Sequence, residues 1–394
     1  MLKLIYPLLF VSSAFLNNAL AQEARSFTSL SDISESKKHE IDQAIPVLMK
    51  QYGVNSVGLG LIKNTELVYS GYFGNQREGV PANKTTQFDV ASITKTMTAE
   101  TVLRLVAADK LTLDEPMANY WVDPDLRNDS KHFKLTPRMA LNHSTGFPNW
   151  RYFSVDGSLM FESEPGTSYS YSGEGFDYLA RMVELKLQKP FDALVNEYVI
   201  QALGLKNTYF HVAKSNFSNL NEALTDEGKH LGHYCFPWGG CREEGSWSAA
   251  DDLRITVEDF AVYLKAVMNA GGYNAALVAD RNTVQTDMTT HPDSVSIVCA
   301  RLARNKCPKE QGYGLGWQVA DYGHTKLISH GGSDWSELAE AYFYTESKDG
   351  VIIFLNGLNQ NSLAMMPHVI KLLDPESPKI PHYEMWYEKE SGGR

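Results

Sequence analysis

Ser92 and Lys95 stand three residues apart, where a helical pattern over residues 94–108 begins. This spacing places both side chains on one face of a helix, close enough to exchange a proton. A serine hydroxyl becomes a nucleophile when a base takes its proton, and the positive end of the helix dipole disfavours an ammonium there while favouring negative charge on the serine oxygen. The alternative is a capping serine beside a solvated lysine.

Tyr171 is a candidate second base. It lies in a turn-rich stretch, residues 165–173, that leads into a helical pattern over residues 176–187. Loops carried by rigid elements often hold catalytic groups, and a phenol or phenolate there would relay the proton of Ser92 to a leaving group, with Lys95 as its cationic neighbour. The alternative is an amphipathic loop tyrosine.

The segment Ser-His-Gly-Gly-Ser-Asp, residues 329–334, follows a predicted strand. Gly331 and Gly332 allow a substrate or another backbone to approach closely. A main-chain N–H at this strand edge, with that of Ser92, would form an oxyanion hole. His330 would bind an anionic substrate group or form a hydrogen bond with Tyr171. The alternative is a glycine hairpin before a packed tryptophan.

The elements that must bring these segments together lie at both ends of the chain. A helix over residues 34–52, kinked at Pro46, precedes strands over 57–62 and 67–73, and strand patterns return at 313–319, 326–329, 338–344 and 351–355 before a closing helix over 362–373. We therefore expect an α/β (α+β) fold whose sheet is built from both termini, about 34–90 and 310–374. A mainly helical insert would span about 91–300, and the Pro-, Glu- and Gly-rich tail, 375–394, would be irregular.

Composition narrows the class of protein. The 394 residues are 43% hydrophobic and 21% charged, which is typical of a globular chain rather than a disordered one. The net charge of −11 argues against nucleic acid as a partner. We expect a small-molecule or short-peptide substrate, no cofactor and no metal.

The first 21 residues are typical of a signal peptide. Lys3 supplies the positive region, residues 4–16 an apolar core, and Ala19 to Ala21 the small residues before cleavage. We expect cleavage after Ala21, a secreted or periplasmic protein, and a mature chain that does not span a membrane, because no later apolar run is long enough.

Export affects how the four cysteines are interpreted. In an oxidising compartment two short-loop disulfides, Cys235–Cys241 and Cys299–Cys307, are the simplest pairing. The alternative is a metal site formed by the two cysteines at 235 and 241 with two nearby histidines, His230 and His233, although this spacing is not typical of structural zinc.

Taken in order, Ser-x-x-Lys, Tyr-Ser-Gly and His-Gly-Gly resemble the motifs of the penicillin-recognising serine hydrolases, and most closely the class C β-lactamase-related group. That group includes β-lactamases, D-alanyl-D-alanine carboxypeptidases, D-aminopeptidases and esterases. Flanking segments at 108–116, 139–147, 245–253 and 313–317 are also similar to it, so the resemblance extends from about residue 34 to 373. It implies a β-lactamase/transpeptidase-like fold.

The resemblance also implies roles. Ser92 matches the acylated serine, Lys95 its base and Tyr171 the second base, while His330, Gly331 and Gly332 occupy the Lys-Thr-Gly motif and Ser333 offers the second oxyanion-hole N–H. The implied reaction is two-step acyl transfer, in which Ser92 attacks an ester or amide carbonyl and water later releases the acyl group. His143 matches a histidine that is structural in the group, rather than the base of a Ser–His pair.

Two positions depart from the group. Gly173 stands where many members have asparagine, which can bind a substrate amide, and His330 stands where they have lysine, a permanent cation. We therefore expect an exported serine hydrolase acting on an ester or a D-amino-acid amide or peptide. A true class C β-lactamase or DD-carboxypeptidase, and a catalytically silent binding protein, are the alternatives.

Overall fold

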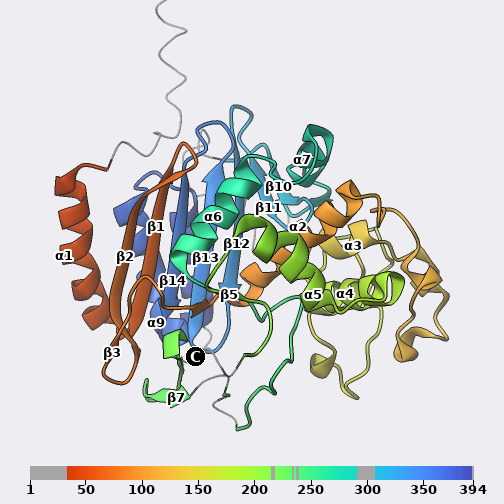
Figure 1. Ribbon diagram of the computed structural model, residues 1–394, viewed down its shortest axis with the longest axis horizontal. Coiled ribbons are helices and arrows are strands. Elements are labelled where there is room, and N and C mark those ends of the chain that lie inside the picture. The colour runs from red at the N-terminus through yellow and green to blue at the C-terminus, as the bar shows by residue number, and fades with distance from the viewer. Residues whose placement is uncertain are drawn as a thin grey trace, which may run out of the picture.

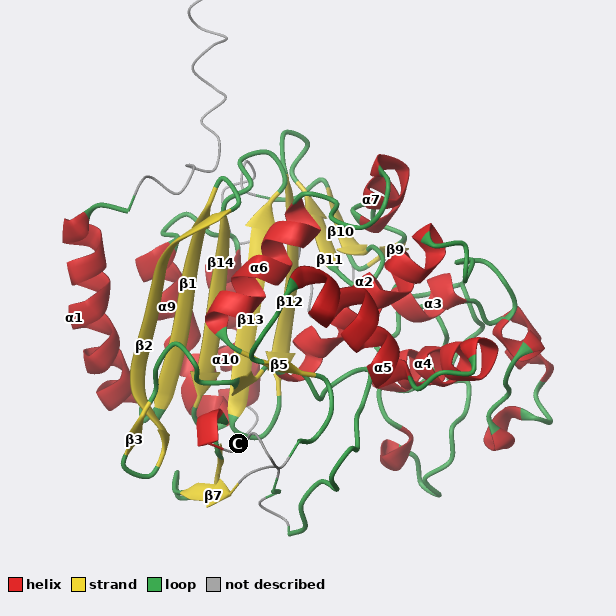
Figure 2. Ribbon diagram, in the orientation of Figure 1, coloured by secondary structure: helices red, strands yellow, loops and turns green. Residues whose placement is uncertain are grey.

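A nine-stranded antiparallel sheet forms the centre of the molecule (Figures 1 and 2). The computed structural model describes residues 33–213, 218–232, 235–236, 239–289, 291 and 307–392. The strands lie in the order β3 (Val80–Pro81), β2 (Glu66–Arg77), β1 (Ser56–Lys63), β14 (Gly350–Asn356), β13 (Glu337–Tyr344), β12 (Lys326–Ser333), β11 (Gln318–Asp321), β10 (Glu310–Tyr313) and β9 (Thr286–Asp287).

Strand β1 joins the two ends of the chain. It pairs antiparallel with β2 on one side and with β14 on the other, where Ser56 lies opposite Asn356. Alternate residues of β14 enter different cores: Ile352 packs in the core on one face of the sheet and Ile353 in the core on the other. The expected sheet built from both termini is therefore confirmed, and both of its faces are buried.

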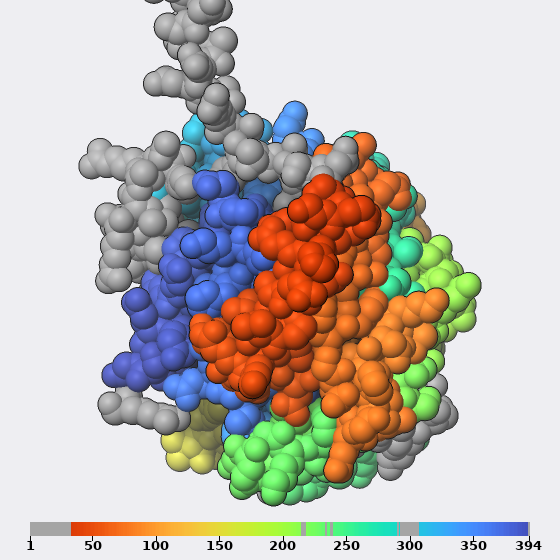
Figure 3. All heavy atoms as spheres, turned by 90° about the vertical axis from the view of Figure 1, so that its left-hand side faces the viewer, coloured from red at the N-terminus to blue at the C-terminus, as the bar shows by residue number. Residues whose placement is uncertain are grey.

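Helices cover both faces of this sheet. Helix α6 (Val257–Met268) crosses one face, and α1 (Glu35–Tyr52) and α9 (Asn359–Leu373) pack together on the other (Figures 1 and 2). In the side view of Figure 3, α1 crosses the surface between early strands and C-terminal segments. Ser34 caps the start of α1 and Gly53, at φ 70°, ends it.

The region between the two halves of the sheet is mainly helical but also contains short strands. Its helices are α2 (Thr94–Ala107), α3 (Pro137–Leu141), α4 (Gly173–Leu187), α5 (Phe191–Val195), α6 and α7 (Ala275–Arg281), with a π-helix at Asn196–Gln201 and 3₁₀ turns at Ala91–Ile93 (η1), Met117–Asn119, Pro124–Leu126, Ser130–Lys134 and Arg151–Phe153. Its strands β4 (Phe88–Asp89), β8 (Arg254–Ile255) and β5 (Thr208–Tyr209) form one small sheet, and β6 (Ala223–Leu224) and β7 (His230–Gly232) form another.

Two predicted elements were wrong in detail. The strand expected over 313–319 is two strands, β10 and β11, because Gly316 adopts φ 77° and approaches α2 so closely that an added Cβ would lie 2.1 Å from Ala99 Cβ. The tail expected to be irregular contains helix α10 (Lys379–Ser391), whose Tyr383 is fully buried. Pro381 is tolerated because it lies in the first turn, where its missing N–H has no partner to lose.

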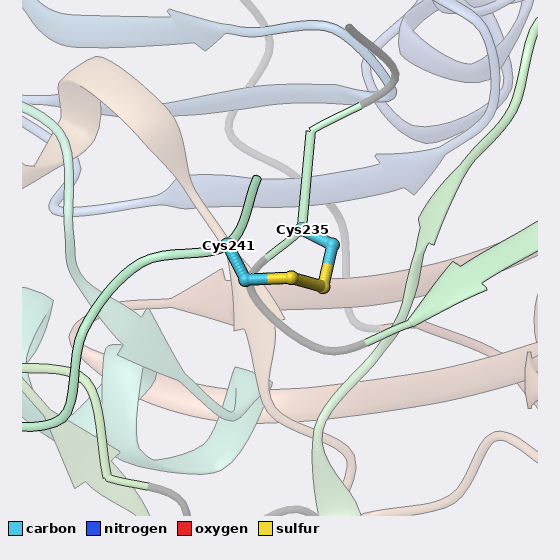
Figure 4. The surroundings of a disulfide bond; sticks show 2 residues. All are labelled: Cys235 and Cys241. Carbon is cyan, nitrogen blue, oxygen red and sulfur yellow. A yellow bond between two sulfur atoms is a disulfide. The ribbon is translucent and has the colours of Figure 1, made fainter. Parts of the chain in front are cut away.

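Cys235 and Cys241 form the expected disulfide (Figure 4). Their sulfurs are therefore not available as thiolate ligands, which contradicts the alternative of a metal site at these cysteines; His233 lies outside the described residues. Cys307 is also disulfide-bonded, and its expected partner Cys299 lies outside the described residues. The predicted signal peptide, residues 1–21, lies outside them too. Within the part of the chain that the structure describes, no helix combines the length and apolarity needed to cross a membrane.

Candidate active site

Ser92 lies in a tight turn that tertiary contacts hold in place. The turn, η1, precedes α2 and includes Ala91 in the left-handed region at φ 45°, which is unusual for a residue with a side chain. The Ala91 N–H donates to Asp89 Oδ1 (3.0 Å), and the Val90 N–H donates to the Leu253 carbonyl (3.2 Å). These bonds stabilise a conformation that the sequence alone does not favour.

Lys95 is fully buried beside this serine. Its Nζ donates to Ser92 Oγ (3.0 Å) and to the Ala250 carbonyl (3.0 Å). Among the described residues no carboxylate lies within 4.0 Å of Nζ, so the amine is held by neutral acceptors rather than by an ion pair. The 3.0 Å contact places the Lys95 amine where it can exchange a proton with the Ser92 hydroxyl.

Asp177 of α4 fixes the carbonyl that holds the lysine. Its carboxylate accepts hydrogen bonds from the Ala249 N–H (2.7 Å) and the Ser248 hydroxyl (3.1 Å). Burial raises the pKa of Asp177 to about 6. Asp177 thus holds the loop at residues 248–250, and this loop positions the Ala250 carbonyl that accepts a hydrogen bond from Lys95.

Tyr171 lies over the same amine and is positioned by a histidine. The Lys95 Nζ is 4.9 Å from the centre of the tyrosine ring, which stacks on His143 at a centroid distance of 4.4 Å. His143 Nδ1 accepts the Ser172 N–H (3.0 Å), and the His143 carbonyl accepts the Ser170 N–H (2.8 Å). Burial holds the pKa of His143 well below its usual range, so the ring is neutral. These contacts support the structural interpretation of His143, which stays a prediction.

The glycine strand passes directly beside the serine turn. A Cβ added to Gly332 of β12 would lie 2.1 Å from the Val90 carbonyl oxygen and 3.1 Å from the Ser92 nitrogen. Only glycine permits this approach. It brings the main chain of β12, including Ser333, to the edge of a cavity that Ser92 also lines. The strand and the start of α2 thus form one continuous surface around the hydroxyl.

The cavity has a volume of about 420 Å³, within the range of small-molecule sites. Sequence-predicted residues on its wall are Ser92, Tyr171, His330, Gly331, Gly332 and Ser333. The structure therefore brings together three segments, the first and last of which are more than two hundred residues apart in the sequence. Gly173 lies at the start of α4, next to this group, although it does not line the cavity.

Comparison with known proteins identifies the family. A family profile described as Beta-lactamase matches residues 41–373, which is most of the chain. The chain belongs to the β-lactamase family. It is a serine hydrolase of the β-lactamase and carboxypeptidase type.

Several other proteins are similar to this chain in sequence or in fold. A putative D-alanyl-D-alanine carboxypeptidase from Escherichia coli K12 is 26% identical over 313 residues, covering 68% of each chain, and one from Salmonella typhi is 25% identical, covering 68% of this chain and 69% of the relative. An octameric penicillin-binding protein homologue from Pyrococcus abyssi (TM-score 0.68, 21% identity, 87% and 78% covered) and the D-alanine carboxypeptidase AmpC from Burkholderia cenocepacia (0.64, 18%, 86% and 98%) have the same fold.

At Gly173, where many members of the β-lactamase family have asparagine, an indole ring occupies the available space. A Cβ added to Gly173 would lie 2.4 Å from the Trp150 ring. The Gly173 N–H instead donates to the Asn149 side-chain oxygen (3.0 Å). A larger residue at position 173 is not compatible with this packing. Position 173 therefore cannot provide a side chain that binds a substrate amide.

His330 is not the cation that the family's lysine provides. It is 1% exposed, and burial lowers its pKa to about 3. Its Nε2 lies 3.3 Å from the Tyr313 hydroxyl and its Nδ1 2.6 Å from the Gly331 carbonyl. The tyrosine that contacts the ring is therefore Tyr313, not the expected Tyr171, and the neutral ring offers no ion pair to an anionic substrate.

Several cavity residues were missed by sequence reasoning. Tyr313 lies in the Tyr-Gly-Leu-Gly-Trp segment, which carried the resemblance but was assigned no role. Others gave no signal because they depend on long-range packing, among them Asn149, Tyr169, Glu340 and the residues of α10. The aromatic-rich stretch around residue 171 was the nearest available indication for Tyr169.

Proposed function

We propose that Ser92 is the acylated nucleophile of an exported hydrolase that cleaves an ester or a D-amino-acid amide or peptide. The observation that carries the proposal is the 3.0 Å contact between the fully buried Lys95 Nζ and Ser92 Oγ. A base at hydrogen-bond distance from a hydroxyl at the cavity wall is the arrangement that nucleophilic catalysis requires.

Acylation begins when Ser92 Oγ bonds to the carbonyl carbon and its proton passes to Lys95. The carbonyl oxygen becomes an oxyanion, which the N–H groups of Ser92 and Ser333 would stabilise. Collapse of the tetrahedral intermediate breaks the bond to the alcohol or amine, which leaves with a proton delivered through Tyr171. Water then attacks the acyl carbon and gives its proton to the same base system. The bond between the acyl carbon and Ser92 Oγ breaks, Oγ takes up that proton, and the acid is released.

The proposed substrate class is based on two features of the site, the absence of a charge at His330 and the lack of space at Gly173. Buried His330 has no charge near neutral pH, and the Trp150 ring leaves no room for an asparagine at Gly173. Both changes weaken the recognition of a penicillin carboxylate and amide, so they favour an ester or peptide over a β-lactam. The curated relatives named as putative D-alanyl-D-alanine carboxypeptidases favour the peptidase alternative.

Labelling tests the nucleophile directly. A fluorophosphonate probe should attach to the wild-type protein at Ser92, identified by peptide mass spectrometry, and should not label Ser92→Ala. Activity is then screened on p-nitrophenyl esters, D-alanyl peptides and nitrocefin, with Ser92→Ala as the control. Nitrocefin turnover comparable to that of a dedicated β-lactamase would contradict the proposed substrate class, and unlabelled wild-type protein would contradict the proposed nucleophile.

A further inference from the structure

Helix α10 forms one wall of the cavity that contains Ser92. It follows the segment matched by the family profile, which ends at residue 373, so the family resemblance assigns it nothing. Its cavity-lining residues recur at helical spacing and so share one face of the helix: Lys379, His382, Tyr383, Trp386 and Glu390, with Met385 and Lys389 beside them.

Buried polar contacts fix this helix beside the glycine strand. Glu340 of β13 is 1% exposed, accepts a hydrogen bond from the Tyr383 hydroxyl (2.7 Å) and pairs with Lys379 Nζ (3.1 Å). Glu340 lies opposite Gly331 in the strand register, and a Cβ on Gly331 would lie 3.3 Å from both Glu340 Oε2 and the Tyr383 hydroxyl. Such a buried, bonded group specifies one position for the helix.

The face that α10 presents to the cavity has an apolar part. Trp386 and Met385 line it together with Met288 and Tyr169, which come from separate segments of the chain. The Trp386 ring stacks on Tyr383, with 5.7 Å between centroids and 27° between planes, so its orientation is tied to the buried contacts with Glu340. A cavity of about 420 Å³ has room for much more than the reacting carbonyl and a methyl group.

We propose that α10 is a specificity element, in which Trp386 and Met385 receive an apolar or aromatic group of the ester substrate while Ser92 attacks its carbonyl. The inference rests on the proposed function, because it names the substrate class of that same site. Burying a ring against these side chains contributes binding free energy that a small ester does not obtain.

Three esters followed by pH-stat titration test this role. Ethyl acetate has no aromatic ring, phenyl acetate has one in the leaving group, and ethyl phenylacetate has one in the acyl group. In Trp386→Ala, we expect kcat/KM to fall about tenfold for the aromatic ester whose ring reaches α10, and less than twofold for ethyl acetate. Glu384→Ala is the matched control, because Glu384 is exposed on the same helix and does not line the cavity.

The outcomes separate this inference from the proposed function. If Trp386→Ala leaves all three kcat/KM values unchanged, or lowers them by one common factor, α10 is not a specificity element although Ser92 hydrolyses esters. If no ester is hydrolysed and fluorophosphonate does not label Ser92, the proposed function fails. Calorimetric titration with phenyl acetate and ethyl phenylacetate tests the role of α10 without turnover, when Ser92→Ala is compared with the double variant Ser92→Ala/Trp386→Ala. Equal affinities of these two proteins for both esters would overturn the proposal.

Discussion

At the scale of single residues, the reactivity of Ser92 depends on contacts outside its own helix. The amine of Lys95 is oriented by the Ala250 carbonyl, and the turn itself contains Ala91 at a positive φ. Such a turn persists only when its surroundings determine it, here the ladder bond to Leu253 and the close approach of Gly332. Small changes in this surrounding shell should therefore alter activity more than stability.

Gly332→Ala tests the close approach of strand β12 to the serine turn. The added methyl group would lie 2.1 Å from the Val90 carbonyl oxygen, so the strand and turn must move apart. A displacement of about 1 Å at a catalytic turn lowers rates by about a hundredfold. We expect kcat/KM for p-nitrophenyl acetate to fall by about that factor, while circular dichroism stays unchanged.

Gly331→Ala is the matched comparison for this prediction, because its methyl group would be 3.3 Å from side-chain atoms of Glu340 and Tyr383, and not from backbone. Its loss of kcat/KM should stay within about tenfold. If the alanine at 332 hydrolyses the ester as well as the alanine at 331, the close approach of β12 to Ser92 is not important for activity.

The neutrality of His330 predicts acid-sensitive stability. Its pKa is about 3 in the folded protein and about 6.5 in the unfolded chain, so between these values the unfolded state binds more protons. The contribution is complete above pH 6.5 and is lost as pH falls toward 3. Between pH 7.5 and 4.5, His330→Asn should lose about 2.5 kcal/mol less unfolding free energy than wild type, measured by urea denaturation.

The pKa of buried His143 is lowered mainly by burial and in part by the neighbouring His330, and His143 remains in both proteins. The difference between the two proteins therefore reports position 330 together with its coupling to His143. His39→Asn serves as the control for the loss of a histidine side chain, because His39 lies at an exposed position of α1. An identical loss of stability in wild type and His330→Asn would show that this histidine is not buried in its neutral form.

At the scale of elements, helix α2 is buried along almost its whole length. Only two of its fourteen residues are not classed as buried, and the buried set includes Lys95 and Glu100. Glu100 pairs with Arg281 of α7 (3.0 Å), each side chain being 1% exposed, and also accepts a hydrogen bond from Tyr273 (2.8 Å). This cluster lies more than one helical turn from Ser92 and connects α2 to α7.

Glu100→Gln tests the buried pair. It keeps the shape of the side chain but leaves the Arg281 charge without its counter-charge in a buried site. Removing one partner of such a pair costs about 3–5 kcal/mol, so the free energy of unfolding should fall by about 3 kcal/mol in urea denaturation.

The exposed pair on α1 provides the control for this change. Glu35 and Lys38 are 2.7 Å apart, and the Glu35 side chain is 88% exposed, so Glu35→Gln should change stability by less than about 0.5 kcal/mol. Equal effects of the two substitutions would mean that Glu100 and Arg281 are solvated in the protein.

The elements that sequence reasoning predicted best have local signals. The helix from Ser34 to Gly53 has its capping residues within the same segment, and the Ser92–Lys95 spacing is set by one helical turn. The features that it missed depend on distant partners. The Trp150 ring fills the space at Gly173 from another loop, and α10 is held by Glu340, so neither can be inferred from neighbouring residues.

At the scale of the whole molecule, the first and last parts of the chain contribute strands to the same sheet. Strand β1 lies between β2 and β14, and the chain that follows β14 returns through α9 to place α10 at the cavity. Contacts of such large sequence separation carry a larger loop-closure entropy cost than local ones. The cavity is complete only when β1 and β14 are paired in one sheet and α10 is packed beside Glu340.

Export is the last property to test on the whole protein. The short apolar segment before Ala21 predicts that the protein recovered outside the cytoplasm begins at Gln22, as read by N-terminal mass spectrometry.

A chain made without residues 2–21 should stay in the cytoplasm. There the Cys235 and Cys241 thiols should react with an alkylating reagent, because that compartment keeps thiols reduced, whereas the exported protein should have them joined. Full-length protein retained in the cytoplasm with Met1 intact would contradict the predicted export. Equal alkylation of both forms would show that the disulfide does not depend on it.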